Sequence, residues 1–282
     1  MSIYKARKIL TISAVLIILT IPMTNASANM NTADAAKLES LIAGEQRKET
    51  NSVRDQYRHP SEVLKFFGLK DEMAVMEIWP AGGWWTEILA PFLSENGRYV
   101  AAHFPAEGGP AYWQRSLNSF KDMLAKDPQN YGKVEIVSLS PNAELSGSTK
   151  PGSMDLVLTF RNLHNWMSQG SQQAVFVTMF DTLKPGGYLG VVEHRESAEK
   201  PQDPKAKSGY VREDYAISLA EGAGFKLIAK SEINANLNDT KDYPGGVWTL
   251  PPSLREGDRE REKYSAIGES DRFTLLFQKP EN

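Results

Sequence analysis

Apolar and polar positions along the chain alternate in blocks that predict strands and helices in turn. Seven short apolar runs have the length of buried strands, at residues 73–79, 99–103, 134–138, 154–160, 188–193, 225–231 and 273–278. Segments with helical spacing of apolar residues precede and separate them, at residues 61–67, 85–93, 112–125, 172–183 and 212–223. This order is typical of a mostly parallel sheet with helices on both faces. We therefore predict an α/β three-layer sandwich.

Local signals divide the chain further. Residues 29–60 are polar, with apolar positions that predict one short helix, and form a helical extension ahead of a domain at 61–282. Ser61 can cap the first helix of that domain, and the segment LKPGG at 183–187 predicts a turn before the fifth strand. Residues 232–272, which contain Trp248, form an insertion between the last two strands. Such a long connection beside a ligand edge is often functional, although it can also simply cover the sheet.

The first residues have the order of a secretory signal. Lys5, Arg7 and Lys8 precede an apolar run at 9–21, and the small residues at 26–28 provide a cleavage site. The alternative is an uncleaved anchor, but the run is shorter than the roughly 20 residues that a membrane span requires. We expect a signal peptide at 1–28, cleavage after Ala28, and a periplasmic or secreted protein without a stable membrane anchor.

Composition and charge narrow the class of partner. The 282 residues are 41% hydrophobic and 24% charged, which is the balance of an ordinary globular protein, and they include no cysteine. Removing the signal removes three positive charges and no negative one, so the formal net charge changes from −3 to −6. An acidic surface argues against nucleic acid as a partner and favours a small-molecule substrate. The mixed charge run at 255–263 is typical of a solvated helix face.

Three segments in this alternation resemble one enzyme family. They are EIWPAGGWWTEIL at 77–89, DLVLTFRNLHNW at 155–166 and LKPGGYLGVVEHR at 183–195. In this order and at these separations they resemble class I S-adenosylmethionine-dependent methyltransferases, above all the quinone-biosynthesis branch and a group of predicted methyltransferases with export signals. The resemblance implies a Rossmann-like, seven-stranded sheet with an antiparallel last strand. It also implies S-adenosylmethionine as cofactor and methyl transfer to a small molecule.

The turn at 77–85 carries the expected cofactor residues. Ligands of open parallel sheets bind beyond the carboxyl ends of the strands, and Gly82 and Gly83 allow a close approach because they lack Cβ atoms. The resemblance implies that Glu77 helps to hold the amino-acid end of the cofactor, with Pro80 and Ala81 on the same turn. Alternatively, Glu77 is a carboxylate in a water-filled crevice.

The turn also departs from the family pattern. Trp79 and Ala81 stand where the family has its first two glycines, so Trp79 either fills cofactor space or forms one wall of it. His103 ends the second strand, where the family commonly has an acid that accepts hydrogen bonds from the ribose. We assign His103 to cofactor binding, although a neutral imidazole offers only one acceptor. The alternative is an ordinary surface histidine.

Candidate catalytic residues follow the fourth strand. His164 is our candidate general base because the ordinary pKa of histidine lies near neutral pH. Asn162 could orient the substrate or the cofactor, and Trp166 could line the same opening. The alternative for both polar residues is a loop capped by its own side chains.

Two other functions stay open at this stage. His103, His164 and His194 would lie along one edge of the sheet, and three imidazoles can form a catalytic zinc site. No close metal-binding spacing supports this, so we assign no metal ligands and keep a metal-assisted hydrolase only as a minor alternative. The other alternative is a Rossmann-like protein that uses the altered crevice to bind a different small molecule.

Overall fold

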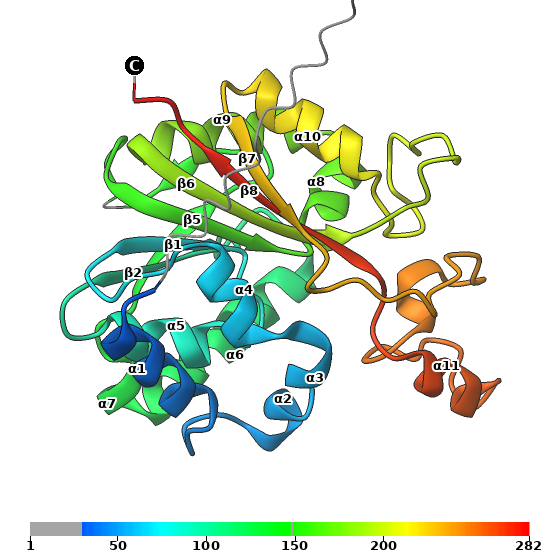
Figure 1. Cartoon of the computed structure of the whole chain (residues 1–282), viewed down its shortest axis with the longest axis horizontal. Coiled ribbons are helices and arrows are strands. Elements are labelled where there is room, and N and C mark those ends of the chain that lie inside the picture. Colours follow the sequence, from blue (N-terminus) through cyan, green and yellow to red (C-terminus); the bar gives the residue numbers. More distant parts are fainter. Residues whose placement is uncertain (1–29, 148, 282) are drawn as a thin grey trace, which may run out of the picture.

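The computed structural model describes residues 30–147 and 149–281, and it contains one mixed sheet at its centre (Figure 1). Strand order is β4-β3-β2-β1-β5-β6-β8-β7. Strands β3, β2, β1, β5 and β6 pair in parallel, whereas β8 runs antiparallel to both of its neighbours. The strand bounds are β1 Ala74–Ile78, β2 Arg98–His103, β3 Glu135–Leu139, β4 Leu145–Ser146, β5 Met154–Phe160, β6 Leu183–His194, β7 Lys226–Ser231 and β8 Arg272–Gln278.

The predicted fold class is confirmed, with one strand more than expected. All seven predicted strands are present, and their order is that of a Rossmann-like sheet with an antiparallel last strand. The eighth, β4, is a two-residue strand in the loop before β5, and it pairs antiparallel with the end of β3. Two residues offer too short a pattern for a sequence-based prediction.

Helices cover both faces of the sheet (Figure 1). Leu38 of α1, Leu64 of α4 and Ile88 of α5 belong to the core on one face, whereas Val175 of α9 and Ala216 of α10 belong to the core on the other. The helix bounds are α1 Thr32–Ile42, α2 Glu49–Ser52, α3 Asp55–Arg58, α4 Pro60–Phe66, α5 Thr86–Leu93, α6 Ala111–Lys126, α7 Pro128–Tyr131, α8 Leu163–Gln169, α9 Gln172–Thr182, α10 Glu213–Gly222, the 3-10 helix η1 Gly246–Thr249 and α11 Arg261–Ile267.

Burial on both faces explains the continuous apolar strands. Along β1, Val75 belongs to one core, and Met76 and Ile78 belong to the other. A strand covered on both sides cannot alternate apolar with polar residues, because both sets of side chains are removed from water.

Several local predictions were wrong at the ends of elements. Helix α4 begins at Pro60, whose fixed φ suits a first helical position, and Ser61 instead donates a hydrogen bond to Glu39. The LKPGG segment belongs to the start of β6, where the Gly186 N–H donates to the Lys279 carbonyl. Residues 163–169, for which the sequence pattern predicted no element, form α8, which ends at Gly170 in the left-handed region.

Residues 232–271 connect β7 to β8 and extend beyond one end of the sheet, at the right of Figure 1. They carry η1 and α11, and the mixed charge run is helical only from Arg261. The predicted signal peptide lies outside the described residues. In the described part of the chain, no helix has the length and apolar character needed to cross a membrane.

Candidate functional site

A cavity of about 480 Å³ lies beyond the carboxyl ends of β1, β5 and β6. The turn after β1, the segment around α2 and α3, the start of α8 and the insertion each contribute to its wall. The lining residues include Asn51, Arg54, Arg58, Glu77, Trp79, Pro80, Ala81, Gly82, Trp84, Trp85, Phe104, Tyr112, Phe160, Arg161, Asn162, His164, Asn165, His194, Trp248 and Ser253. The cavity therefore lies at the edge where the sequence predicted a ligand, and its volume suits a small molecule.

The backbone of the turn after β1 adopts left-handed conformations at residues that are not glycine. The φ angle is +48° at Trp79 and +50° at Ala81, with Pro80 between them, and +81° at Gly83. A non-glycine residue in this region costs about 1 kcal/mol or more, and such strain persists mainly at functional sites. The turn thus keeps a glycine-like path at the two positions where the family has glycines.

The two glycines of the turn differ in their surroundings. A Cβ atom on Gly82 would meet nothing within 4 Å, and Gly82 lines the cavity. A Cβ on Gly83 would lie 2.7 Å from the Met123 side chain, so Gly83 allows α6 to pack against the turn. Of the two, only Gly82 is placed to contact a ligand.

The Trp79 side chain crosses the sheet edge toward β3. Its indole Nε1 donates to the Leu139 carbonyl at 3.2 Å, and its ring centroid lies 4.7 Å from Phe104 and 5.6 Å from Trp113. Only 3% of Trp79 is exposed. Both roles considered for Trp79 describe its position, because its ring fills space over the ends of β2 and β3 and also forms part of the cavity wall.

His103 does not line the cavity, and it is not a surface residue either. It is fully buried, its Nδ1 accepts the Phe104 N–H at 2.8 Å, and its Nε2 lies 3.1 Å from the Ala81 carbonyl. These partners define a neutral ring with the proton on Nε2, and burial lowers the pKa of His103 to about 4. In this position His103 braces the turn, and its nitrogens are not available to a ribose.

Glu77 does line the cavity, but its carboxylate is bound by the protein. Tyr99 donates to Glu77 Oε2 at 2.5 Å, and the Tyr99 hydroxyl lies 2.8 Å from Thr86 Oγ1 at the start of α5. Burial raises the pKa of Glu77 to about 7, against the effect of the Tyr99 hydrogen bond. Glu77 on β1 is therefore linked to β2 through Tyr99, and through the same hydroxyl to the start of α5.

Asn162 and His164 both line the cavity. Asn162 Nδ2 donates to the Ile78 carbonyl at 2.8 Å, which ties the ends of β1 and β5 together. His164 Nδ1 lies 3.0 Å from Glu193 Oε1, and the same carboxylate accepts the N–H groups of His164 and His194. Because a carboxylate accepts hydrogen bonds, the His164 proton lies on Nδ1, and Nε2 remains as an acceptor.

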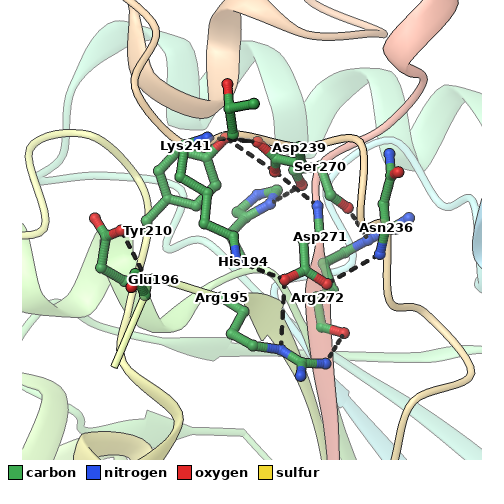
Figure 2. A network of polar contacts seen from close by, with 12 residues as sticks. His194, Arg195, Glu196, Tyr210, Asn236, Asp239, Lys241, Ser270, Asp271 and Arg272 are labelled. Carbon is green, nitrogen blue, oxygen red and sulfur yellow. Dashed lines mark hydrogen bonds and ion pairs between the residues drawn. The ribbon is translucent and has the colours of Figure 1, made fainter. Parts of the chain in front are cut away.

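Polar residues at the ends of β6 and β8 form a network that ties the insertion to the sheet (Figure 2). His194 Nδ1 lies 2.5 Å from Ser270 Oγ, and burial lowers the pKa of His194 well below its usual range. Asp271 Oδ2 forms ion pairs with Lys241 Nζ at 2.8 Å and with Arg195 Nε at 3.6 Å. The insertion residues that close the cavity are thus held against the ends of β6 and β8.

The three histidines considered for a metal do not converge. His164, Glu193 and His194 bring possible ligand atoms within 4.8 Å of one another, but His103 is not part of this group. The proposed three-histidine site is therefore wrong. Glu193 is already bound by a histidine ring and two backbone N–H groups.

Several residues of the site were missed from the sequence. Glu193 supports His164, and Arg54, Arg58 and Arg161 form a charged wall. Arg161 directly follows β5 and could have been found from its position in FRNL. The contribution of α3 could not, because nothing in the pattern places residues 54–58 beside a strand end.

Comparison with known proteins shows the fold. No family model matches the chain, and no curated protein matches it. Among solved structures, an S-adenosylmethionine-dependent methyltransferase from Aquifex aeolicus is 16% identical, with a TM-score of 0.55 over 87% of this chain and 98% of that one. The [4+2]-cyclase SpnF is 14% identical, with a TM-score of 0.56 over 88% of this chain and 94% of that one.

A third similar structure contains a ligand. Phosphoethanolamine N-methyltransferase 2 of Haemonchus contortus, in complex with S-adenosyl-L-methionine, is 14% identical, with a TM-score of 0.54 over 88% of this chain and 57% of that one. At such identities the similarity shows a methyltransferase-like fold. It does not show a reaction, because one fold can support several.

Proposed function

We propose that the protein is an S-adenosylmethionine-dependent methyltransferase that acts on a small molecule after export to the periplasm or the exterior. The observation that carries this proposal is the turn at 79–83. Its glycine-like path is kept at Trp79 and Ala81 despite their side chains, and it opens directly onto the cavity. Strain kept at a strand end beside a cavity supports a ligand-binding turn.

The residues at the site fit one end of the cofactor and not the other. Glu77, Ala81, Gly82 and Asn162 line the cavity and could hold the amino-acid end. The usual ribose position at the end of β2 does not fit, because His103 is buried there and Trp79 fills the neighbouring space. The amino-acid end of the cofactor would therefore lie at the turn, and the end of β2 would not hold the ribose.

The cofactor would supply an electrophilic methyl group. This chain would supply position and a base, since aromatic side chains and His164 line the cavity and the Nδ1 of His164 is held by Glu193. An acceptor O–H or N–H would give its proton to Nε2 of His164. Glu193 would hold the opposite ring nitrogen and stabilise the imidazolium that forms.

Calorimetry of residues 29–282 with S-adenosylmethionine and S-adenosylhomocysteine tests the proposal. We expect binding that Gly82→Leu abolishes, because the added side chain would enter the cavity without meeting the protein. Gly222→Leu, at an exposed end of α10, is the matched control and should bind normally. Absence of heat with both ligands at millimolar concentration would reject the methyltransferase.

A second candidate, a repurposed small-molecule-binding protein with this fold, is favoured by one observation. Trp79, Phe104 and Trp113 pack together where the family holds the ribose. The predicted export points the same way, because S-adenosylmethionine is made in the cytoplasm. This candidate replaces the first if the titrations with both cofactor forms give no heat.

A further inference from the structure

One wall of the cavity is formed by three arginines, Arg54, Arg58 and Arg161, which we call the arginine wall. Arg54 and Arg58 stand at the two ends of the single turn α3, and Arg161 directly follows β5. Arg58 is 3% exposed. Three cationic side chains from two distant segments thus meet at one cavity.

The arginine wall has more positive than negative charge around it. Glu269 pairs with Arg54 at 2.6 Å, with Arg58 at 3.3 Å and with Arg272 at 3.1 Å. Arg161 makes no ion pair with any of the described residues. Besides Glu269, Glu193 is the carboxylate whose charge raises the pKa of Arg161. Burial, together with the neighbouring arginines, lowers the pKa of Arg161 to about 10 and that of Arg58 well below its usual range.

Several donors of the arginine wall have no hydrogen-bond acceptor. Nη2 of Arg54 and Nη2 of Arg58 are buried and unpartnered within residues 30–147 and 149–281. The Arg58 guanidinium is held in place by the Trp84 ring, whose centroid lies 4.6 Å away. These two donors leave charge on the wall that the protein does not satisfy. Arg161 is partly exposed and lines the cavity, so an anion in the cavity would compensate this charge through the Arg161 guanidinium.

The shape beside the arginine wall suits a flat body. Trp85 and Phe160 stack with centroids 4.0 Å apart and an interplanar angle of 16°, and both line the cavity. His164 lies three residues after Arg161, so Arg161 and the candidate base belong to one short segment after β5, and both line the cavity.

We propose that the arginine wall binds the carboxylate or phosphate group of a small organic acid whose flat body lies against Trp85 and Phe160. Guanidinium groups bind such oxyanions through paired N–H donors. This inference deepens the proposed function, and it rests on that proposal in naming the acid as the methyl acceptor. Binding of the oxyanion itself can be measured without any cofactor.

Titration of the native protein with benzoate and with phenyl phosphate tests the inference, with neutral benzyl alcohol as the ligand control. We expect one or both anions to bind, and benzyl alcohol to bind at least tenfold more weakly. Arg161→Gln should weaken anion binding by about tenfold or more, because the anion loses a charge partner at the cavity wall. Arg259→Gln, which changes an exposed arginine, should leave it unchanged.

Thermal unfolding of the same variants separates loss of binding from loss of folding. Without ligand, Arg161→Gln should unfold at the same or a higher temperature than the native protein, because one of several like charges is removed. With benzoate, the native protein should gain stability and the variant should not. Equal affinity in the native protein and Arg161→Gln, or no binding of either anion, would overturn the inference.

S-adenosylhomocysteine and methylthioadenosine, which lacks the carboxylate, identify the source of the oxyanion. If the acid is the methyl acceptor, benzoate and S-adenosylhomocysteine bind the protein at the same time, and Arg161→Gln leaves the affinity for S-adenosylhomocysteine unchanged. If instead benzoate and S-adenosylhomocysteine compete, and Arg161→Gln weakens binding of S-adenosylhomocysteine but not of methylthioadenosine, the arginine wall binds the cofactor carboxylate. That result would overturn the assignment of the acid as methyl acceptor. Anion binding without any cofactor binding would reject the proposed methyltransferase and keep the anion site.

Discussion

The two halves of the crevice at the end of the sheet have opposite characters. Over β1, β5 and β6 lies the open half, a cavity with arginines, histidines and the carboxylate of Glu77 on its wall. Over β2 and β3 lies the filled half, where Trp79, Phe104 and Trp113 pack together with centroids 4.7–5.6 Å apart. One turn, at residues 79–83, borders both halves.

This difference teaches that a fold can keep the path of a binding turn while changing what surrounds it. The turn keeps left-handed backbone conformations at Trp79 and Ala81. The Trp79 side chain, however, fills the space beside β2, and the ring of the buried His103 lies against the Ala81 carbonyl. Buried aromatic area stabilises the filled half, whereas the open half keeps more arginine charge than Glu269 pairs. Stability and binding are thus separated along one strand edge.

The largest expected effect is on the filled half. Trp79→Ala should lower the free energy of unfolding by about 3–5 kcal/mol, because it removes a buried indole and its hydrogen bond to Leu139. Chemical denaturation measures this loss.

Trp248→Ala is the matched change in the open half, since this half-buried indole lines the cavity mouth. It should cost about 1 kcal/mol. Equal losses for the two tryptophans would remove the distinction between the halves.

How much of this contrast could be predicted from the sequence depends on the range of the signal. The positions of the strands followed from hydrophobic periodicity and the position of the turn from the residues around Gly82, whereas the antiparallel last strand came from the family resemblance. The direction of the Trp79 side chain did not, because it depends on the Leu139 carbonyl, sixty residues away. Sequence patterns record which residues are apolar, but not which of two spaces they fill.

The second prediction concerns pH and the filled half. The pKa of His103 falls from 6.5 to about 4 on folding, so the unfolded chain binds more protons below pH 6.5. Its contribution to stability should be complete above that pH and should decrease by up to about 3 kcal/mol as the pH falls to 4. His103→Gln cannot titrate, and denaturation at pH 7.5 and 4.5 should show a weaker pH dependence for this variant than for the native protein. A parallel dependence in both proteins would show that His103 is not buried as described.

The open half should respond to pH with the opposite sign. The pKa of Glu77 rises from 4.5 to about 7 on folding, so the folded chain binds more protons, and stability decreases as the pH rises through 7. Glu77→Gln should therefore stabilise the protein by about 2 kcal/mol at pH 8, and by little at pH 5. If Glu77→Gln is less stable than the native protein at pH 8, the ionised Glu77 carboxylate does not destabilise the folded protein, contrary to this prediction.

Most of the predicted residues at strand ends lie at the cavity, whereas lining residues supplied from elsewhere were missed. Asn162 and His164 follow β5 and line the cavity, as the topology requires. His103 also follows a strand, but the local backbone buries its ring. Arg54 and Arg58 belong to the N-terminal extension, and only tertiary packing brings them to the cavity.

The central claim is that ligands occupy the open half while the filled half stays closed. A crystal structure of the protein grown with S-adenosylhomocysteine tests it most directly. We predict the amino-acid end of the ligand against Ala81 and Gly82, with the Trp79 indole still bonded to the Leu139 carbonyl. A ribose at the end of β2, with Trp79 rotated away from Leu139, would contradict the claim.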